Sequence, residues 1–311
     1  MTDPELLASQ PNDAYFKEVF SQPEHATAFF RQHLPAEVAT GIDWTTLTLL
    51  PSSFVKQSLQ QAHSDLIFSA SIGELDMLLY LLFEHQTTPD PLMPLRLLGY
   101  LLEILQQHER KHGLPLPPVL PFVLHQGPEE WSVSTSFEDL FELPPGMAQA
   151  LLPFLPKFRH GLLDLSRFDP AKDEADAQVR VVLQLMKLAR EKRMLEFFAW
   201  LAVEFADGLT KDLLRRSLLY ALHADTDLDV EQIGRTLELN HELKEHAMSI
   251  AQKLIAKGKA EGSWVGKIQL LEKLLGLPVS TETVLDDLTL ADLQSRFVEL
   301  ERRYEQEFKQ R

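Results

Sequence analysis

The sequence contains no cysteine. Without a thiol, the chain can form neither a disulfide framework nor a thiolate metal site, and it cannot carry a cysteine nucleophile. It also lacks the short motifs of three common enzyme classes: the His-Glu-x-x-His of zinc hydrolases, the Gly-x-Ser-x-Gly of serine hydrolases and the Gly-x-x-x-x-Gly-Lys of phosphate-binding loops. These absences exclude thiol redox chemistry and argue against those three classes.

Long uncharged apolar runs are also missing. The longest stretches, 75–83 and 194–206, are interrupted by acidic residues and fall short of the ~20 residues that a bilayer requires. The first ten residues are acidic and have neither the basic start nor the apolar centre of a signal peptide. We therefore expect no membrane partner and a cytoplasmic location.

Positive charge is scarce in the first half of the chain. The 311 residues carry 46 acidic and 30 basic side chains, for a formal net charge of −16. Residues 1–150 hold 6 Lys and Arg against 19 Asp and Glu, whereas residues 151–311 hold 24 against 27. A field of this sign repels phosphate over long range, so any contact with nucleic acid must be local.

Apolar spacing and turn residues predict an α/β fold in the first half. The expected elements are one or two helices over 13–33, strands over 44–50, 65–72 and 77–83, a helix from Leu95 to a stop at Gly113, and a strand over 119–124. A turn at Gly73 makes the second and third strands a hairpin. The resulting αβββαβ order is the core topology of restriction-endonuclease-like enzymes.

The second half reads as helices. Amphipathic or apolar segments predict helices over 173–193, 194–206, 211–223, 229–258 and 291–309. A Pro-Pro-Gly turn at 144–146 suggests a boundary, so we expect an α/β domain over 1–145, a helical domain over 146–262 and a helical tail over 263–311. Residues 241–275 hold 6 lysines against 4 glutamates, which fits a solvated helix and a DNA contact equally well.

Two carboxylates and an amide are expected to converge at one end of the hairpin. Asp65 opens the second strand, and Glu84 and Gln86 close the third. A turn of about four residues at Gly73 pairs position 65 with roughly position 84, and side chains two apart share a strand face. Oxygen ligands of this kind suit a hard cation, Mg²⁺ or Mn²⁺, which lowers the pKa of bound water and neutralises phosphate charge.

A plainer interpretation is that Asp65 and Glu84 are solubilising residues at strand ends. The third strand, however, is too apolar to be exposed. Two neighbouring carboxylates at its end would be costly without a cation or a proton between them. This argument favours a metal site over a solvated edge.

At these residues the chain resembles a known family. The segment 12–20 (Asn-Asp-Ala-Tyr-Phe-Lys-Glu-Val-Phe), the Ser-Asp-Leu at 64–66 and above all 82–96 (Leu-Phe-Glu-His-Gln-Thr-Thr-Pro-Asp-Pro-Leu-Met-Pro-Leu-Arg) look like the Rpn family, the recombination-promoting nucleases and transposase-like proteins of the PD-(D/E)XK superfamily. The resemblance covers most of residues 12–130 and continues in a reduced Gly-containing charged repeat within 248–262.

The resemblance implies a magnesium-dependent DNA endonuclease in which Asp65 and Glu84 bind the metal. Gln86 stands where the superfamily usually has lysine, and glutamine can orient water but cannot act as a base. Lys17, on the first helix, is the nearest substitute for that lysine by motif.

The implied partners are DNA and, as an open alternative, a second copy of the chain. The missing lysine keeps another hypothesis open, a regulatory protein that retains the nuclease fold without efficient catalysis.

Overall fold

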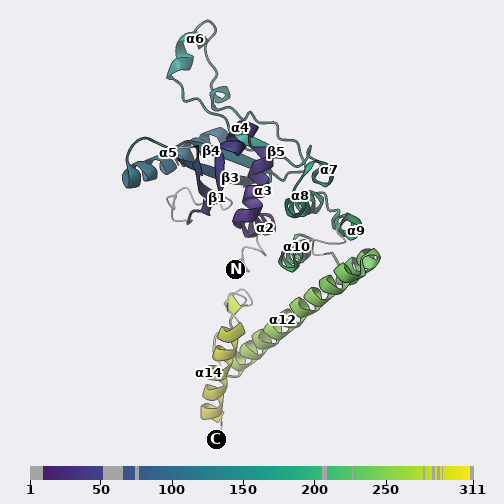
Figure 1. The fold of residues 1–311 in the computed structure, drawn as a ribbon. Coiled ribbons are helices and arrows are strands. Elements are labelled where there is room, and N and C mark those ends of the chain that lie inside the picture. The colour runs from purple at the N-terminus through teal and green to yellow at the C-terminus, as the bar shows by residue number, and fades with distance from the viewer. Residues whose placement is uncertain are drawn as a thin grey trace. The chain divides into compact units, whose positions relative to one another are not determined.

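The computed structural model describes residues 10–51, 66–73, 77–204, 209–225, 227–275, 277–281, 284–285, 288 and 290–308. The chain forms two compact units, Met1–Leu239 and Asn240–Arg311, which we describe separately (Figure 1).

The first unit is built on a five-stranded mixed sheet. Its strands are β1 (Ile42–Leu49), β2 (Leu66–Ile72), β3 (Met77–Gln86), β4 (Val119–His125) and β5 (Gly161–Asp164), in that spatial order. The first three strands pair antiparallel, and β3, β4 and β5 pair in parallel. The predicted α/β class is confirmed, and the three-strand, helix, strand order is observed. The short strand β5 was not predicted.

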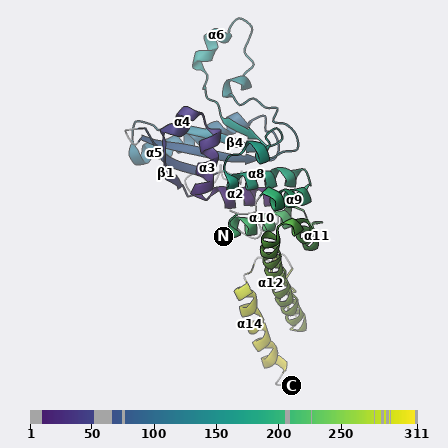
Figure 2. The same ribbon diagram turned by 45° about the vertical axis from the view of Figure 1, so that its right-hand side comes forward.

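Helices cover both faces of this sheet (Figures 1 and 2). On one face lie α2 (Pro11–Phe20) and α3 (Pro23–His33), followed by the short α4 (Ala36–Gly41); Phe16, Phe20, Phe29 and Phe30 surround Phe83 of β3 with ring centroids 4.6–5.1 Å away. The rings of this face are fully buried. Burial of such aromatic clusters is a large part of a domain's stability.

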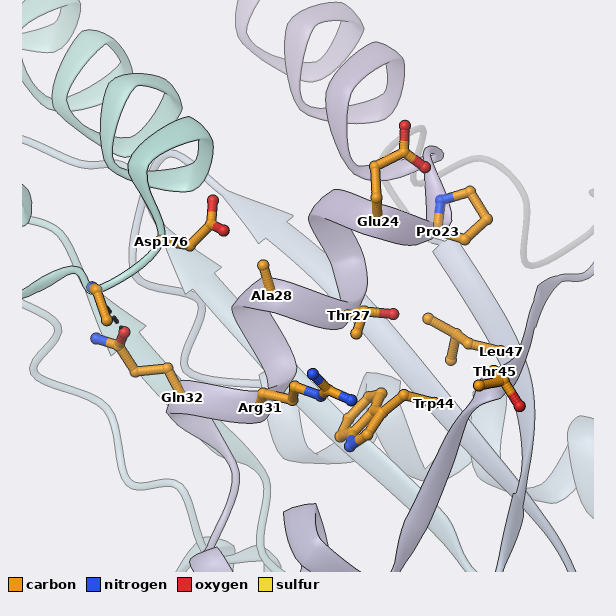
Figure 3. A pocket seen from close by; sticks show the side chains of 11 residues that line it. Pro23, Glu24, Thr27, Ala28, Arg31, Gln32, Trp44, Thr45, Leu47 and Asp176 are labelled. Carbon is orange, nitrogen blue, oxygen red and sulfur yellow. Dashed lines mark hydrogen bonds between the residues drawn. The ribbon is translucent and has the colours of Figure 1, made fainter. Parts of the chain in front are cut away.

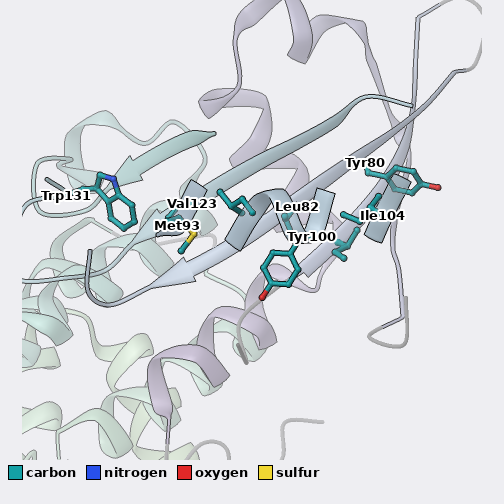
Figure 4. Close-up of a cluster of buried hydrophobic side chains, with 9 residues drawn as sticks. Tyr80, Leu82, Met93, Tyr100, Ile104, Val123 and Trp131 are labelled. Atoms are coloured by element: carbon teal, nitrogen blue, oxygen red, sulfur yellow. The ribbon is translucent and has the colours of Figure 1, made fainter. Parts of the chain in front are cut away.

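The other face is covered by α5 (Met93–His112). Its Met93, Leu97, Tyr100 and Ile104 pack on the face of the sheet opposite to Phe83 (Figure 4). The cluster is completed by Ile67, Tyr80, Leu82, Val123 and Trp131. Leu82 therefore points toward α5 and Phe83 toward α2 and α3, as the two-residue period of a strand requires.

Two glycines lie where the sequence predicts a turn and a helix stop. Gly73 follows β2 with a φ of 74°, and Gly113 ends α5 with a φ of 76°. Both lie in the left-handed region, which glycine reaches without the steric cost that a Cβ imposes. The helix stop expected at Gly113 is confirmed.

The remainder of the first unit is mostly helical. Its elements are η2 (Phe137–Leu140), α6 (Ala148–Leu151), η3 (Leu152–Phe154), α7 (Pro170–Asp173), α8 (Ala177–Arg190), α9 (Met194–Glu204), α10 (Lys211–Ala224), α11 (Val230–Thr236) and η4 (Leu237–Leu239). Asp176 caps α8 by accepting from the amides of Gln178 and Val179, and Thr210 caps α10 at Leu213.

This arrangement differs from the expected boundary at 145/146. Strand β5 lies in the same sheet as β4, and Tyr220 of α10 stacks on Tyr15 of α2 with centroids 4.4 Å apart. The Pro-Pro-Gly turn thus lies in a connection within one compact unit, because the later helices complete the core that the first helices begin.

The second unit consists mainly of α12 (His241–Leu274) and α14 (Leu290–Phe308). Their core contains Val265 and Ile268 of α12 and Leu293 and Leu300 of α14, together with Leu285 from the segment between the helices. Asn240 caps α12 at Leu243, so the helix expected over 229–258 is divided there. The expected boundary at 262/263 falls inside α12, which continues through its glycines. Searched over the described residues, the structure has no helix with the length and apolarity needed to cross a bilayer.

Candidate active site

Glu84 and Gln86 lie at the carboxyl end of β3, on the face that α5 covers. The carboxylate of Glu84 is fully buried, and Gln86 Nε2 donates to Glu84 Oε2 over 3.1 Å. The convergence of these two side chains, expected from their spacing along a strand, is observed. This hydrogen bond fixes the orientation of the Glu84 carboxylate.

The hairpin register agrees with the expected pairing. Leu66 of β2 lies opposite Phe83 of β3, and Ile72 opposite Met77. Asp65, the expected second carboxylate, lies outside the described residues. The role of Asp65 therefore stays a prediction.

Arg96 is a site residue that sequence reasoning missed. It lies on the first turn of α5, and its Nη2 is 3.4 Å from Glu84 Oε2 while Nη1 donates to Asp90 Oδ2 over 3.1 Å. Asp90 in turn accepts from the Leu92 amide just before the helix begins. A buried carboxylate is costly without a counter-charge, and Arg96 supplies one. The sequence feature that could have identified it is a lone arginine in the first turn of the helix that follows β3.

The structure places Lys17 on α2. Its neighbour Phe16 stacks on His85 at 5.1 Å and packs on Phe83, so α2 covers the face of β3 opposite Glu84. This arrangement does not support a role for Lys17 in place of the lysine that Gln86 replaces, and that role stays a prediction.

His85 points away from Glu84 into a buried polar network. Its Nδ1 lies 2.6 Å from Asp13 Oδ1, and its Nε2 lies 2.8 Å from Gln126 Oε1. Gln126 Nε2 donates to the Met186 carbonyl over 2.7 Å, which fixes the orientation of its amide. These bonds join α2, β3 and α8 to Gln126, the residue that follows β4, so His85 has a structural role.

Tyr220 completes this network from α10. Its hydroxyl accepts from Gln126 Nε2 over 2.9 Å and donates to Asn12 Oδ1 over 2.6 Å. Burial raises the pKa of Tyr220, while the bond from Gln126 acts in the opposite direction. Tyr15 beside it bonds Ser217 over 3.0 Å, and burial raises its pKa too. The tyrosines therefore remain neutral.

His125 ends β4 opposite Gln86 in the parallel register. The ring is buried, and Nε2 lies 2.9 Å from the carbonyl of Glu129, which can only accept. His125 therefore donates from Nε2, and this hydrogen bond ties the ring to the loop that follows β4. This environment fits a structural histidine better than a phosphate ligand.

The donor chemistry of the site fits a hard cation. Glu84 offers carboxylate oxygens and Gln86 an amide oxygen, the ligand types that Mg²⁺ takes together with water. Within the described ranges, no group of three or more His, Asp or Glu side chains gathers as a metal site. The second carboxylate that the sequence predicts for this site, Asp65, lies beyond those ranges.

A surface groove lies elsewhere in the first unit. It has a volume of about 890 Å³ and runs between α3, β1 and the start of α8 (Figure 3). Arg31 lies over the Trp44 ring at 5.8 Å from its centroid, and Glu24 and Asp176 line the groove further along. Neither Glu84 nor Gln86 lines it, so this groove is separate from the carboxylate site.

Comparison with known proteins identifies the class. The model of the family described as "Putative transposase, YhgA-like" matches residues 10–215, about two thirds of the chain. The chain belongs to this family.

Its relatives include recombination-promoting nucleases. The chain is 26% identical to the inactive recombination-promoting nuclease-like protein RpnE of Escherichia coli K12 over 295 residues, which are 93% of this chain and 97% of RpnE. It is 26% identical to the recombination-promoting nuclease RpnA of the same strain over 85% of this chain and 90% of RpnA. It is 36% identical to the recombination-promoting nuclease RpnD of E. coli O157:H7 over 41% of this chain and 51% of RpnD. No solved structure matches the chain.

Proposed function

We propose that the protein is a divalent-metal-dependent DNA endonuclease linked to recombination or mobile elements. Two relatives, RpnA and RpnD, carry the name recombination-promoting nuclease. The helix, three-strand, helix, strand order supports a restriction-endonuclease-like core of the PD-(D/E)XK kind. The helices of the second unit would contribute DNA contacts, dimerisation or both.

The observation that carries the proposal is the environment of Glu84. A fully buried carboxylate lies at the end of a central strand, held by Gln86 and faced by Arg96. A buried carboxylate that meets an amide donor and a guanidinium at a strand end is costly to desolvate, and a bound cation would offset that cost. In the proposed enzyme Glu84 and Asp65 hold Mg²⁺, or Mn²⁺ in its place.

The bound cation would supply charge neutralisation at the scissile phosphate and a more acidic water. The residues of the chain would orient and fix the carboxylate that binds this cation. Gln86 orients the Glu84 carboxylate, and the rigid packing of β3 between its helix layers keeps that carboxylate in place. Since Gln86 cannot accept a proton as a base, it acts by orienting.

The charge of the chain predicts weak DNA binding. With 19 acidic against 6 basic side chains in the first 150 residues, the intrinsic affinity for DNA should depend strongly on divalent metal. The more balanced second half, or a second subunit, would then supply most of the backbone contacts.

The test is cleavage of supercoiled plasmid by the full chain in Mg²⁺. We expect nicked and linear products in the wild type and none in Asp65→Ala. Glu37→Gln on the exposed surface of α4 serves as a control and should cut like the wild type. If the purified wild type cuts no DNA in Mg²⁺ or Mn²⁺, the proposal is wrong.

A second candidate is a nuclease-like binding or regulatory protein with little or no catalysis. The name of RpnE, inactive recombination-promoting nuclease-like protein, and the glutamine at position 86 favour it. Calorimetric titration with Mg²⁺ separates the two, because a binding protein has no need for a metal site that is lost in Glu84→Gln.

A further inference from the structure

We propose that Arg96 is the catalytic cation of this site, the group that contacts the scissile phosphate in the place of the missing lysine. The inference rests on the proposed function and goes beyond it by assigning a residue outside the strand motif. It is based on the position of the guanidinium, its remaining donors and the charge around it.

The position of Arg96 follows from the link between β3 and α5. The chain leaves β3 at Gln86, turns, and begins α5 at Met93, which returns across the same face of the sheet. Arg96 stands on the first turn of that helix, so its side chain reaches the strand end and not the sheet centre. The result is the 3.4 Å contact between Nη2 and the Glu84 carboxylate.

Asp90 holds the guanidinium from the other side. Nη1 donates to Asp90 Oδ2 over 3.1 Å, and both side chains are slightly more than a quarter exposed. Glu84 is fully buried beneath them. The guanidinium therefore spans from a buried carboxylate to the protein surface, where a phosphate of a nucleic acid can approach it.

Arg96 also has unused donor capacity. Nη1 and Nη2 each carry two N–H groups and use one of them on Asp90 and Glu84 respectively, so one donor remains on each nitrogen of this partly exposed side chain, whereas Nε is buried. An arginine presents five N–H donors in a planar fork that matches phosphate oxygens. When the Glu84 carboxylate is committed to a cation, the other N–H of Nη2 becomes available as well, while the bond from Nη1 to Asp90 keeps the side chain in place.

The charge at the site requires such a residue. Gln86 is neutral, and Lys17 lies on a helix that covers the opposite face. A phosphate next to Glu84 and Asp90 needs positive charge beyond that of the metal, and a fixed guanidinium supplies it without reorganisation. Arg96 is thus a counter-ion to Glu84 before substrate binds and a phosphate ligand afterwards.

The experiment measures metal binding and DNA cleavage separately in Arg96→Met. Removal of a positive charge close to the carboxylate should strengthen binding of Mg²⁺ by roughly tenfold, measured by calorimetry without DNA. Single-turnover cleavage of plasmid at saturating Mg²⁺ should fall by about 10²-fold, the typical loss for one electrostatic donor to a transition state. A purely structural role would weaken both.

Two further variants make the result specific. Arg96→Lys keeps the charge but not the fork, so it should retain wild-type metal affinity and cut at an intermediate rate; it also serves if Arg96→Met does not fold. Arg110→Met, at the other end of α5, removes an arginine 3.6 Å from Glu103 and should leave metal affinity and cleavage unchanged.

The outcomes separate this proposal from the proposed function. Wild-type cleavage that persists at full rate in Arg96→Met would overturn the role of Arg96 and leave the nuclease intact. Tighter Mg²⁺ binding with unchanged cleavage would reduce Arg96 to a counter-ion. A wild type that cuts nothing would contradict the nuclease itself and the role of Arg96 with it.

Discussion

Gln86 donates a hydrogen bond to the Glu84 carboxylate over 3.1 Å, from two residues further along the same strand face. The two residues that the sequence predicts at the strand end are therefore in direct contact. In the proposed site Gln86 orients the Glu84 carboxylate, and Arg96 of α5 supplies positive charge 3.4 Å from it.

Gln86→Leu tests this orienting role. Leucine has a similar size but no donor, so Glu84 loses a hydrogen bond worth about 1–3 kcal/mol to a charged group. We expect roughly tenfold slower plasmid cleavage and a weaker Mg²⁺ site. Gln86→Glu replaces the donor by a second acceptor and should be at least as impaired; equal activity of wild type and both variants would contradict the role.

The buried network behind the site predicts a stability effect. Tyr220→Phe removes the hydroxyl that links Gln126 to Asn12 and leaves both side chains without that partner. Unfolding in urea should show a loss of about 1–3 kcal/mol. Tyr15→Phe, which removes one bond to Ser217, should cost less. A Tyr220→Phe protein as stable as the wild type would show that the network contributes little.

His160 predicts a pH dependence of stability. Burial lowers its pKa, and the bond to the Gly161 carbonyl opposes this effect in part. The unfolded chain therefore binds a proton more readily than the folded one, so this contribution is complete above about pH 6.5 and is lost as the pH falls toward the lowered folded value.

The measurement is the free energy of unfolding at pH 7.5 and pH 5.5. His160→Gln should show a smaller decrease on acidification than the wild type. His241→Gln, at an exposed position of α12, should keep the wild-type decrease. Identical slopes in all three proteins would contradict the assignment to His160.

Metal binding should also stabilise the folded protein. A ligand that binds only the folded state at about 100 times its Kd contributes about 2.7 kcal/mol. We therefore expect Mg²⁺ to raise the thermal midpoint of the wild type, EDTA to reverse the rise, and Glu84→Gln to show neither effect. An equal rise in Glu84→Gln would place the bound metal at another site.

The hairpin and its carboxylate end were predictable because their determinants are local. The glycine at 73 sets the turn, the turn sets the register, and the two-residue period of β3 places Glu84 and Gln86 on one face. The stop at Gly113 is equally local. These features depend on neighbours within about 20 residues.

The features that were missed depend on distant contacts. Strand β5 has only four residues and exists because β4 offers it a parallel edge. The boundary expected at 145/146 is not where the compact unit ends, because Tyr15 stacks on Tyr220, a residue far from it in the sequence. Arg96 was overlooked because its role depends on the direction in which α5 crosses the sheet, and that direction is a property of the tertiary fold.

The most direct test of the account is the dependence of DNA cleavage on Glu84. Full-length wild type and Glu84→Gln are compared on supercoiled plasmid in Mg²⁺ and in EDTA, after both are shown to be folded. The account predicts cleavage only by the wild type and only with Mg²⁺. Cleavage by Glu84→Gln at the wild-type rate, or cleavage by the wild type in EDTA, would contradict it.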